Sequence, residues 1–130
     1  MKKIFFIAMV LLTALVSASC SKSSDNEPES QDEYYVKYEA TNTTRYSGDV
    51  SEISITTDEG IKTFVGGKSF TETFGPVKKG FVAKITCTNK AYSNTSIIVT
   101  IHTSKNNGPF ALKATVSGTE SASASYTIDF

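Results

Sequence analysis

The stretch that decides the fold is residues 97–116, which read IIVTIHTSKNNGPFALKATV. Apolar and polar residues alternate on both sides of Asn106-Asn107-Gly108-Pro109, and a period of two is typical of strands with one buried face. Asn and Gly tolerate the positive φ angles that tight hairpin turns require. We therefore predict an antiparallel hairpin of residues 97–103 and 110–116. Its apolar face would hold Ile97, Val99, Ile101, Phe110, Leu112, Ala114 and Val116, with Lys113 and Thr115 pointing outward.

Working outward from this hairpin, the same alternation recurs in six further runs of the chain. They are residues 36–40, 50–55, 61–65, 70–74, 81–87 and 126–130. Residues that favour turns separate them, at Asp58-Glu59-Gly60, Gly66-Gly67, Gly75-Pro76 and Lys78-Lys79-Gly80. Short strands at this spacing suggest two packed sheets. We predict an all-β, immunoglobulin-like antiparallel β-sandwich of seven to eight strands over residues 34–130.

Composition narrows the class of protein. The chain has 130 residues, enough for one ordinary domain, with 13 basic and 13 acidic side chains. This balance argues against a nucleic-acid partner, because a phosphate-binding surface needs a basic excess. Two cysteines and one histidine do not supply a zinc site or a disulfide scaffold. We expect neither a metal nor another cofactor.

The N-terminus resembles a bacterial lipoprotein signal. Met1-Lys2-Lys3 precedes thirteen apolar or small residues at 4–16, a run too short for a bilayer core that needs roughly 20 helical residues. Ser17-Ala18-Ser19 then leads to Cys20, as in a lipobox, although the usual Leu three residues before the cysteine is replaced by Ser17. We predict a signal peptide at 1–19 and lipidation of Cys20. The alternative is ordinary secretion that leaves a free thiol.

Residues 20–33 have the composition of a flexible tether. They hold one lysine and five acidic residues and show no apolar periodicity, so they bury too little apolar area to offset the entropy of ordering. Two or more acyl chains on Cys20 would anchor the protein stably. We expect a location in the cell envelope at the outer membrane, with the periplasmic and surface faces both open.

Five short motifs of the body, at residues 36–41, 53–57, 70–74, 77–80 and 122–126, carry a resemblance to a known family. With these motifs the body resembles a domain of small Bacteroidetes lipoproteins that is similar to the MmpS group (mycobacterial membrane protein, small). It implies an immunoglobulin-like sandwich. The chain departs from the group in lacking tryptophan and in having a lipid anchor in place of a membrane helix. The exporter-accessory role of the mycobacterial proteins is therefore not carried over as a specific function.

Individual side chains could carry chemistry, and each has a simpler interpretation. Cys87 alternates with apolar residues, so we expect a buried structural thiol and not a reactive one. His102 could be a general base, but we favour a lone surface histidine. Asp58-Glu59 could bind calcium, but a hairpin turn is simpler. Lys78-Lys79 could contact phosphate, but two solvated lysines at a corner are more common.

Two further groups concern sugars. Asn42-Thr43-Thr44 and Asn94-Thr95-Ser96 match the eukaryotic glycosylation pattern, which is irrelevant for a bacterial protein. Tyrosines near the predicted strand ends could stack on sugars or contact a protein, although packing in the core or at an edge is the simpler interpretation. These are Tyr34, Tyr35, Tyr46 and Tyr92.

Three functions are compatible with these features. The first is a lipid-anchored, noncatalytic envelope protein that acts as a protein-interaction or transport-accessory module, held to the membrane through Cys20. The second is a carbohydrate-binding surface module, and the third, least favoured, is a small hydrolase. We expect no enzyme. An uncapped strand edge would also permit a homodimer.

Overall fold

A computed structural model describes residues 31–43, 51–90 and 95–130. The predicted signal peptide, Cys20 and the tether up to residue 30 lie outside these ranges. The folded body is one compact unit, Asp32–Phe130. Over the described ranges, no helix is long and apolar enough to span a bilayer.

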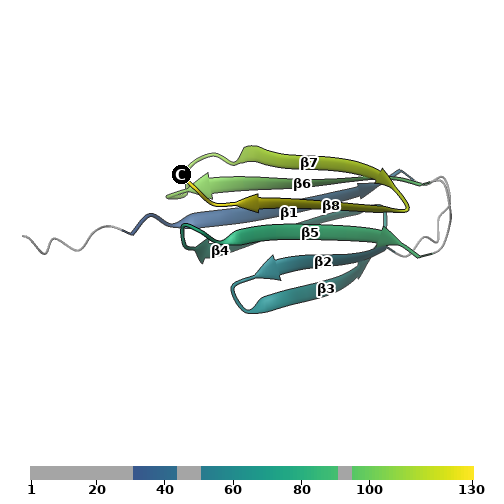
Figure 1. The fold of residues 1–130 in the computed structure, drawn as a ribbon, viewed down its shortest axis with the longest axis horizontal. Coiled ribbons are helices and arrows are strands. Elements are labelled where there is room, and N and C mark those ends of the chain that lie inside the picture. Colours follow the sequence, from purple (N-terminus) through teal and green to yellow (C-terminus); the bar gives the residue numbers. More distant parts are fainter. Residues whose placement is uncertain (1–30, 44–50, 91–94) are drawn as a thin grey trace, which may run out of the picture. The chain divides into compact units, whose positions relative to one another are not determined.

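The body consists of eight strands in two antiparallel sheets (Figure 1). Sheet A has the order β4-β1-β6-β7 and sheet B has the order β3-β2-β5-β8. The strands of both sheets run roughly along one axis, as in aligned sandwiches. This confirms the predicted antiparallel β-sandwich. The strands are β1 (Tyr34–Asn42), β2 (Ser51–Thr57), β3 (Gly60–Gly66), β4 (Ser69–Val77), β5 (Val82–Asn89), β6 (Ser96–Lys105), β7 (Ala111–Thr119) and β8 (Ser121–Thr127).

The core forms where the inner faces of the two sheets meet. Alternate residues of β1, β2, β5 and β6 are buried, as their period of two predicts. Tyr38 is fully buried, yet its hydroxyl donates to the Thr56 carbonyl at 2.8 Å and accepts from the Lys84 amide at 3.1 Å. Because both partners lie in sheet B, this phenol ties the two sheets together while its polar atom stays satisfied.

The predicted hairpin is confirmed, and Ala114 and Val116 lie opposite the buried Ile101 and Val99 as predicted, but the residues before Ala114 were placed on the wrong face. β6 pairs with β7 in antiparallel register, and the register shifts between Ile101 and His102 because Lys113 of β7 forms a bulge. A bulge inserts one extra residue and so reverses the alternation beyond it. As a result Leu112 pairs with His102 and lies on the outer face. Leu112 is 54% exposed and Phe110, just before β7, is 40% exposed.

Lys113 was also placed wrongly, since it does not point outward into solvent. Its Nζ lies 4.0 Å from the ring centroid of Phe130 and 5.6 Å from that of Tyr126. The half-buried Lys113 side chain therefore covers the margin of the sandwich between β7 and the C-terminus.

Two strand boundaries also differ from the prediction. Gly75-Pro76 lies inside β4 and is not a corner, because β4 is an edge strand and needs no amide hydrogen there. The last strand begins at Ser121 and ends at Thr127, so it buries Ala122 and Ala124. Alanine is only weakly apolar, which is why the alternation of 121–125 gave too little signal.

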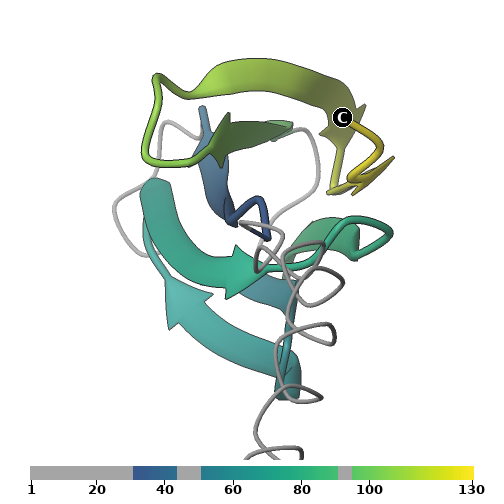
Figure 2. The same ribbon diagram turned by 90° about the vertical axis from the view of Figure 1, so that its left-hand side faces the viewer.

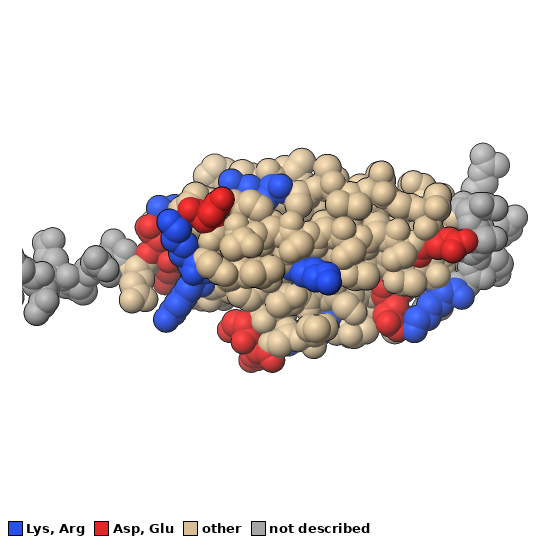
Figure 3. Space-filling model, viewed as in Figure 1, with Lys and Arg blue, Asp and Glu red and all other residues tan. Residues whose placement is uncertain are grey.

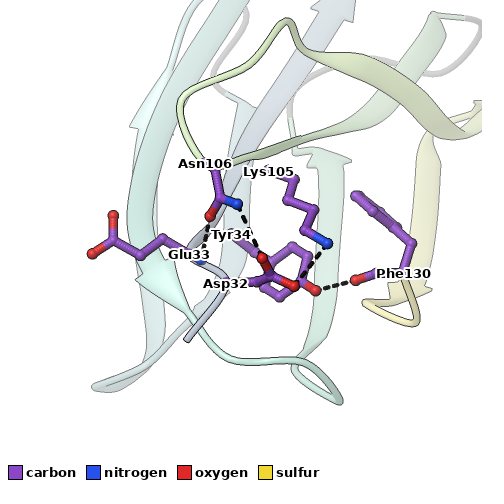
Figure 4. A network of polar contacts seen from close by, with 6 residues as sticks. All are labelled: Asp32, Glu33, Tyr34, Lys105, Asn106 and Phe130. Atoms are coloured by element: carbon purple, nitrogen blue, oxygen red, sulfur yellow. Dashed lines mark hydrogen bonds and ion pairs between the residues drawn. The ribbon is translucent and has the colours of Figure 1, made fainter. Parts of the chain in front are cut away.

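The chain enters the sandwich at the end where its C-terminus lies (Figure 2). Figure 4 shows the contacts that hold this end together. Asp32 accepts from Lys105 Nζ at 2.7 Å and from Asn106 Nδ2 at 3.0 Å, and the Tyr34 hydroxyl donates to the Phe130 carbonyl. Asp32 and Glu33, the last two residues of the predicted tether, thus contact the β6–β7 hairpin. These contacts hold Asp32 and Glu33 against the body.

Candidate functional site

The outer face of sheet A carries a compact group of polar side chains. On β1, Lys37 and Glu39 point outward, and the register places Lys37 opposite His102 and Glu39 opposite Thr100. His102 Nε2 lies 2.9 Å from Glu39 Oε2, and Lys37 Nζ lies 3.1 Å from Glu39 Oε1. Thr100 Oγ1 donates to Glu39 Oε2 at 3.2 Å. We call Lys37, Glu39, Thr100 and His102 the polar cluster.

The carboxylate is the centre of this polar cluster. Partial burial acts to raise the pKa of Glu39, but the hydrogen bond and charge of Lys37, with smaller contributions from His102 and Thr100, outweigh burial and lower that pKa. Glu39 is therefore ionised at neutral pH. The interpretation of His102 as a lone surface histidine was wrong: it faces outward, but its side chain is only 20% exposed and has a carboxylate partner.

Apolar side chains border the polar cluster. Phe110 and Leu112 lie beyond His102 towards β7, and Lys37 Nζ stands 5.5 Å from the Phe110 ring centroid. Ile98, 40% exposed, lies two residues before Thr100 on β6. These three aliphatic and aromatic groups expose apolar surface beside a charged centre, an arrangement typical of protein interfaces.

A shallow depression of about 270 Å³ adjoins the cluster on the same face. It runs across the β4, β1 and β6 strands, with Glu39 and Thr100 from the cluster among its lining residues. Its other lining residues are Ala40, Thr41, Ser69, Phe70, Thr71 and Ile98. The depression offers an acceptor, hydroxyl groups and apolar carbon, so it could accommodate a side chain of a partner.

The end of the sandwich holds a second, larger depression of about 460 Å³. It brings together Asp58 and Lys78, two residues weighed separately from the sequence, with Pro76, Val77 and Phe81. Asp58 and Glu59 form the predicted hairpin turn, and Glu59 pairs with Lys62 at 2.8 Å. Lys78 and Lys79 are exposed at the predicted corner. The opposite charges here leave no net field that would select an ion.

The remaining predicted residues are structural where the structure describes them. Cys87 is 1% exposed, which confirms a buried thiol, and burial raises its pKa against a hydrogen bond from Ser51. Tyr34 is 2% exposed and packs edge-on against Phe130 with ring centroids 5.4 Å apart, so it offers no surface to a sugar. Asn42 is 4% exposed, and its Nδ2 donates to Ser51 Oγ at 3.0 Å.

Tyr35 is half-buried, and its hydroxyl donates to Glu33 Oε2 at 3.2 Å. Tyr46, Tyr92, Asn94 and Cys20 lie outside the described residues. Across the ranges that the structure describes, no group of three or more His, Cys, Asp or Glu side chains is placed to hold a metal ion.

Sequence reasoning missed the polar cluster. Glu39 and His102 are 63 positions apart, and their contact depends on the pairing of β1 with β6. The alternation of each strand did indicate that Lys37, Glu39, Thr100 and His102 share outward faces. The sequence of a single strand does not reveal which other strands lie beside it, and the polar cluster forms only because β1 and β6 are neighbours.

Comparisons with protein-family models, with curated proteins and with solved structures find no match to this chain. The functional argument therefore depends on the residues themselves.

Proposed function

We propose that this chain is a lipid-anchored, noncatalytic envelope protein whose β-sandwich binds a protein partner through the outer face of sheet A. The observation that carries the proposal is the joint exposure of Ile98, Phe110 and Leu112 around the polar cluster. A few side chains at the centre of an interface supply most of its binding energy, and aromatic residues such as Phe110 are enriched at interfaces. A neighbouring charged group supplies orientation and specificity.

The chemistry of the polar cluster suits recognition. Glu39 already accepts three contacts, so a partner would add donors at its remaining exposed side, which is 35% accessible. Lys37 keeps 27% of its side chain exposed between Glu39 and Phe110. An acidic or carbonyl-rich partner segment could contact Lys37 while apolar side chains pack on Phe110 and Leu112.

The anchor would confine this surface to the membrane. The proposal has acyl chains on Cys20 at the outer membrane and a tether reaching the body at Asp32. The contacts of Asp32 and Glu33 with the β6–β7 hairpin support a fixed point of entry. The sandwich would then stand away from the lipid, with the outer faces of both sheets accessible, on either the periplasmic or the external side.

Metabolic labelling with an alkyne fatty acid tests the anchor. We expect label on the wild-type chain and none on a Cys20→Ser variant, with a diacylated or triacylated Cys20 as the N-terminal residue by mass spectrometry. An unmodified mature N-terminus would refute the lipid anchor and leave ordinary secretion.

Site-specific photo-cross-linking in intact cells tests the interaction face. A photoreactive phenylalanine at position 110 should give one discrete cross-linked product, and a matched probe at Thr127 on the exposed face of sheet B should not. Adding Leu112→Asp should abolish the product at position 110 while the chain stays folded. A product of equal yield from both probes, or none, would contradict the proposal. Identification of an exporter subunit would favour the transport-accessory form of the function.

The observation that favours the alternative, a carbohydrate-binding function, concerns the outer face of sheet B. The outward positions of sheet B carry many hydroxyl groups, which can hydrogen-bond to sugars, and two pairs already contact each other: Thr86 with Ser123 at 2.9 Å and Ser54 with Thr63 at 3.3 Å. On the side seen in Figure 3, with sheet B in front, charged groups concentrate towards the two ends. Glycan-array binding that a Thr86→Ala, Ser123→Ala double variant loses would support this alternative, and a blank array would eliminate it.

A further inference from the structure

Of the four edge strands, β3 is the least protected against pairing with another strand. β4 contains Pro76 and faces a register irregularity between Tyr34 and Val36 of β1. β7 contains a bulge at Lys113, opposite Ile101 and His102, and β7 and β8 lie against each other. β3 instead pairs with β2 through seven consecutive residues with no irregularity and contains no proline. Natural proteins block edge pairing with bulges, prolines and charged side chains. β3 has no bulge and no proline, and its one charged side chain, Lys62 opposite the buried Ile55, is neutralised by Glu59.

The free edge of β3 also carries the two most exposed large apolar side chains of the described residues. Ile61 is 77% exposed and Val65 is 73% exposed. Both project outward from sheet B because they pair with the outward-facing Thr56 and Glu52 of β2. Exposed aliphatic groups on an unpaired strand indicate a surface that is covered in the assembled state.

We propose that β3 pairs antiparallel with β3 of a second copy of this chain, with the twofold axis at Thr63. In this register Thr63 lies opposite its own counterpart, and Ile61 of each copy lies opposite Val65 of the other. Gly60 then lies opposite Gly66. The pairing would join two four-stranded sheets into one eight-stranded sheet and cover both aliphatic side chains across the new strand pair.

The charges near β3 favour this register and favour a second copy of the chain as the partner. Residues 58 and 68 are equally distant from position 63, so the acidic Asp58-Glu59 turn of each copy comes beside Lys68 of the other. Lys62, the one charged residue of β3, faces Phe64 of the second copy and not a second lysine. Its Nζ is already paired with Glu59 at 2.8 Å, so the strand brings no unpaired like charges together.

The interface would be small. One seven-residue strand pair buries less than the roughly 1,600 Å² of a standard interface, so we expect a dissociation constant on the order of micromolar. The pairing uses the edge of β3 and not the outer face of sheet A. Dimerisation through β3 is therefore independent of the proposed binding of a protein partner, and a test can refute either one without refuting the other.

Disulfide trapping of the full chain in its native membrane tests the register. Opposing residues of an antiparallel pair have Cα atoms about 4.5–5.5 Å apart, within the range that a disulfide spans. Thr63→Cys should therefore form a covalent dimer on mild oxidation several-fold more efficiently than Ser123→Cys, a control at another exposed position, on β8. Mixed Ile61→Cys and Val65→Cys chains should cross-link to each other more than either does alone. The wild-type chain controls for Cys20 and Cys87.

A charge-swap experiment tests the pairing without any covalent bond. Thr63→Lys should make the detergent-solubilised full chain monomeric in sedimentation, because two lysines would meet at the axis, and Thr63→Glu should do the same. Mixing the two variants should restore a dimer. Because Thr63 is exposed, circular dichroism should show both variants folded. A monomeric wild type, a dimer that persists in Thr63→Lys, or equal trapping at Ser123→Cys would overturn the proposal.

Discussion

The two outermost strands of the sandwich, β7 and β3, differ in how their unpaired edges are protected from pairing with another strand. They lie at opposite margins in Figure 1, and each has one edge without a strand partner among the described residues. β7 contains a bulge at Lys113, packs against β8 of the other sheet and places Lys113 over the Phe130 ring. β3 is regular and exposes Ile61 and Val65. The β7 margin is therefore covered by other parts of the same chain, whereas the β3 margin is exposed.

The contrast extends to how the sheets meet at each margin. At the β7 margin, β7 and β8 are joined by the turn at Glu120, whose backbone contacts Thr95 and Asn89. At the β3 margin Phe64 of sheet B packs against Phe70 of sheet A, with ring centroids 5.1 Å apart. We infer that substitutions at the β7 margin change the stability of the monomer, whereas those at the edge of β3 change association.

The largest expected difference between the margins comes from the same substitution at two glycines. An alanine Cβ at Gly118 of β7 would lie 2.0 Å from the Ser121 carbonyl oxygen, whereas at Gly67, beside β3, no atom lies within 4 Å. We expect Gly118→Ala to lower the free energy of unfolding by about 3 kcal/mol, because backbone must move. Gly67→Ala should change it by no more than about 0.5 kcal/mol. Urea unfolding of both variants measures this, and equal effects would remove the distinction between the margins.

The next effect concerns the lysine that covers the β7 margin. Lys113→Met keeps the aliphatic stem but removes the charge that lies 4.0 Å from the Phe130 ring centroid. We expect a loss of about 1 kcal/mol, within the range for partly desolvated cation–π contacts. Lys84→Met, at an exposed position of β5, is the matched control and should be nearly neutral. The hypothesis fails if both substitutions have the same effect in thermal unfolding.

This margin also shows how far sequence reasoning reaches. The hairpin of residues 97–116 was predictable because its alternation and its Asn-Asn-Gly turn are local signals. The outward placement of Leu112 was not, because the unbroken alternation of Leu112, Ala114 and Val116 does not reveal that Lys113 between them forms a bulge. The polar cluster and the open edge of β3 both depend on strand order. Strand order is a long-range property that no single segment encodes.

A buried hydroxyl next to β7 allows a prediction of opposite sign. Thr103 pairs with Ala111 of β7, is 1% exposed, and its Oγ1 has no hydrogen-bond partner among the described residues. Thr103→Val replaces the hydroxyl with a methyl group of similar size, so we expect a gain of about 0.5–1 kcal/mol. Thr100→Val, on the same strand, removes a hydrogen bond to Glu39 and should be destabilising instead. Chemical denaturation that shows a loss for Thr103→Val would mean that its hydroxyl is satisfied.

The smallest expected effect on stability is that of Asp32, which contacts the β6–β7 hairpin just before β1. Hydrogen bonds from Lys105 and Asn106, with the charge of Lys105, lower the pKa of Asp32 in the folded protein against a small opposing effect of desolvation. A carboxyl group whose pKa is lower in the folded state stabilises above its unfolded pKa, and this contribution is lost as pH falls through the folded value. Asp32→Asn should therefore lower the Tm slightly at pH 7 and not at all well below pH 3.8, when both chains are neutral at this position. A pH series of thermal unfolding measures the two curves, which should converge in acid. If the difference persisted at pH 2, shape and not charge would hold the entering chain against the hairpin, and the closure of the β7 margin would be independent of pH.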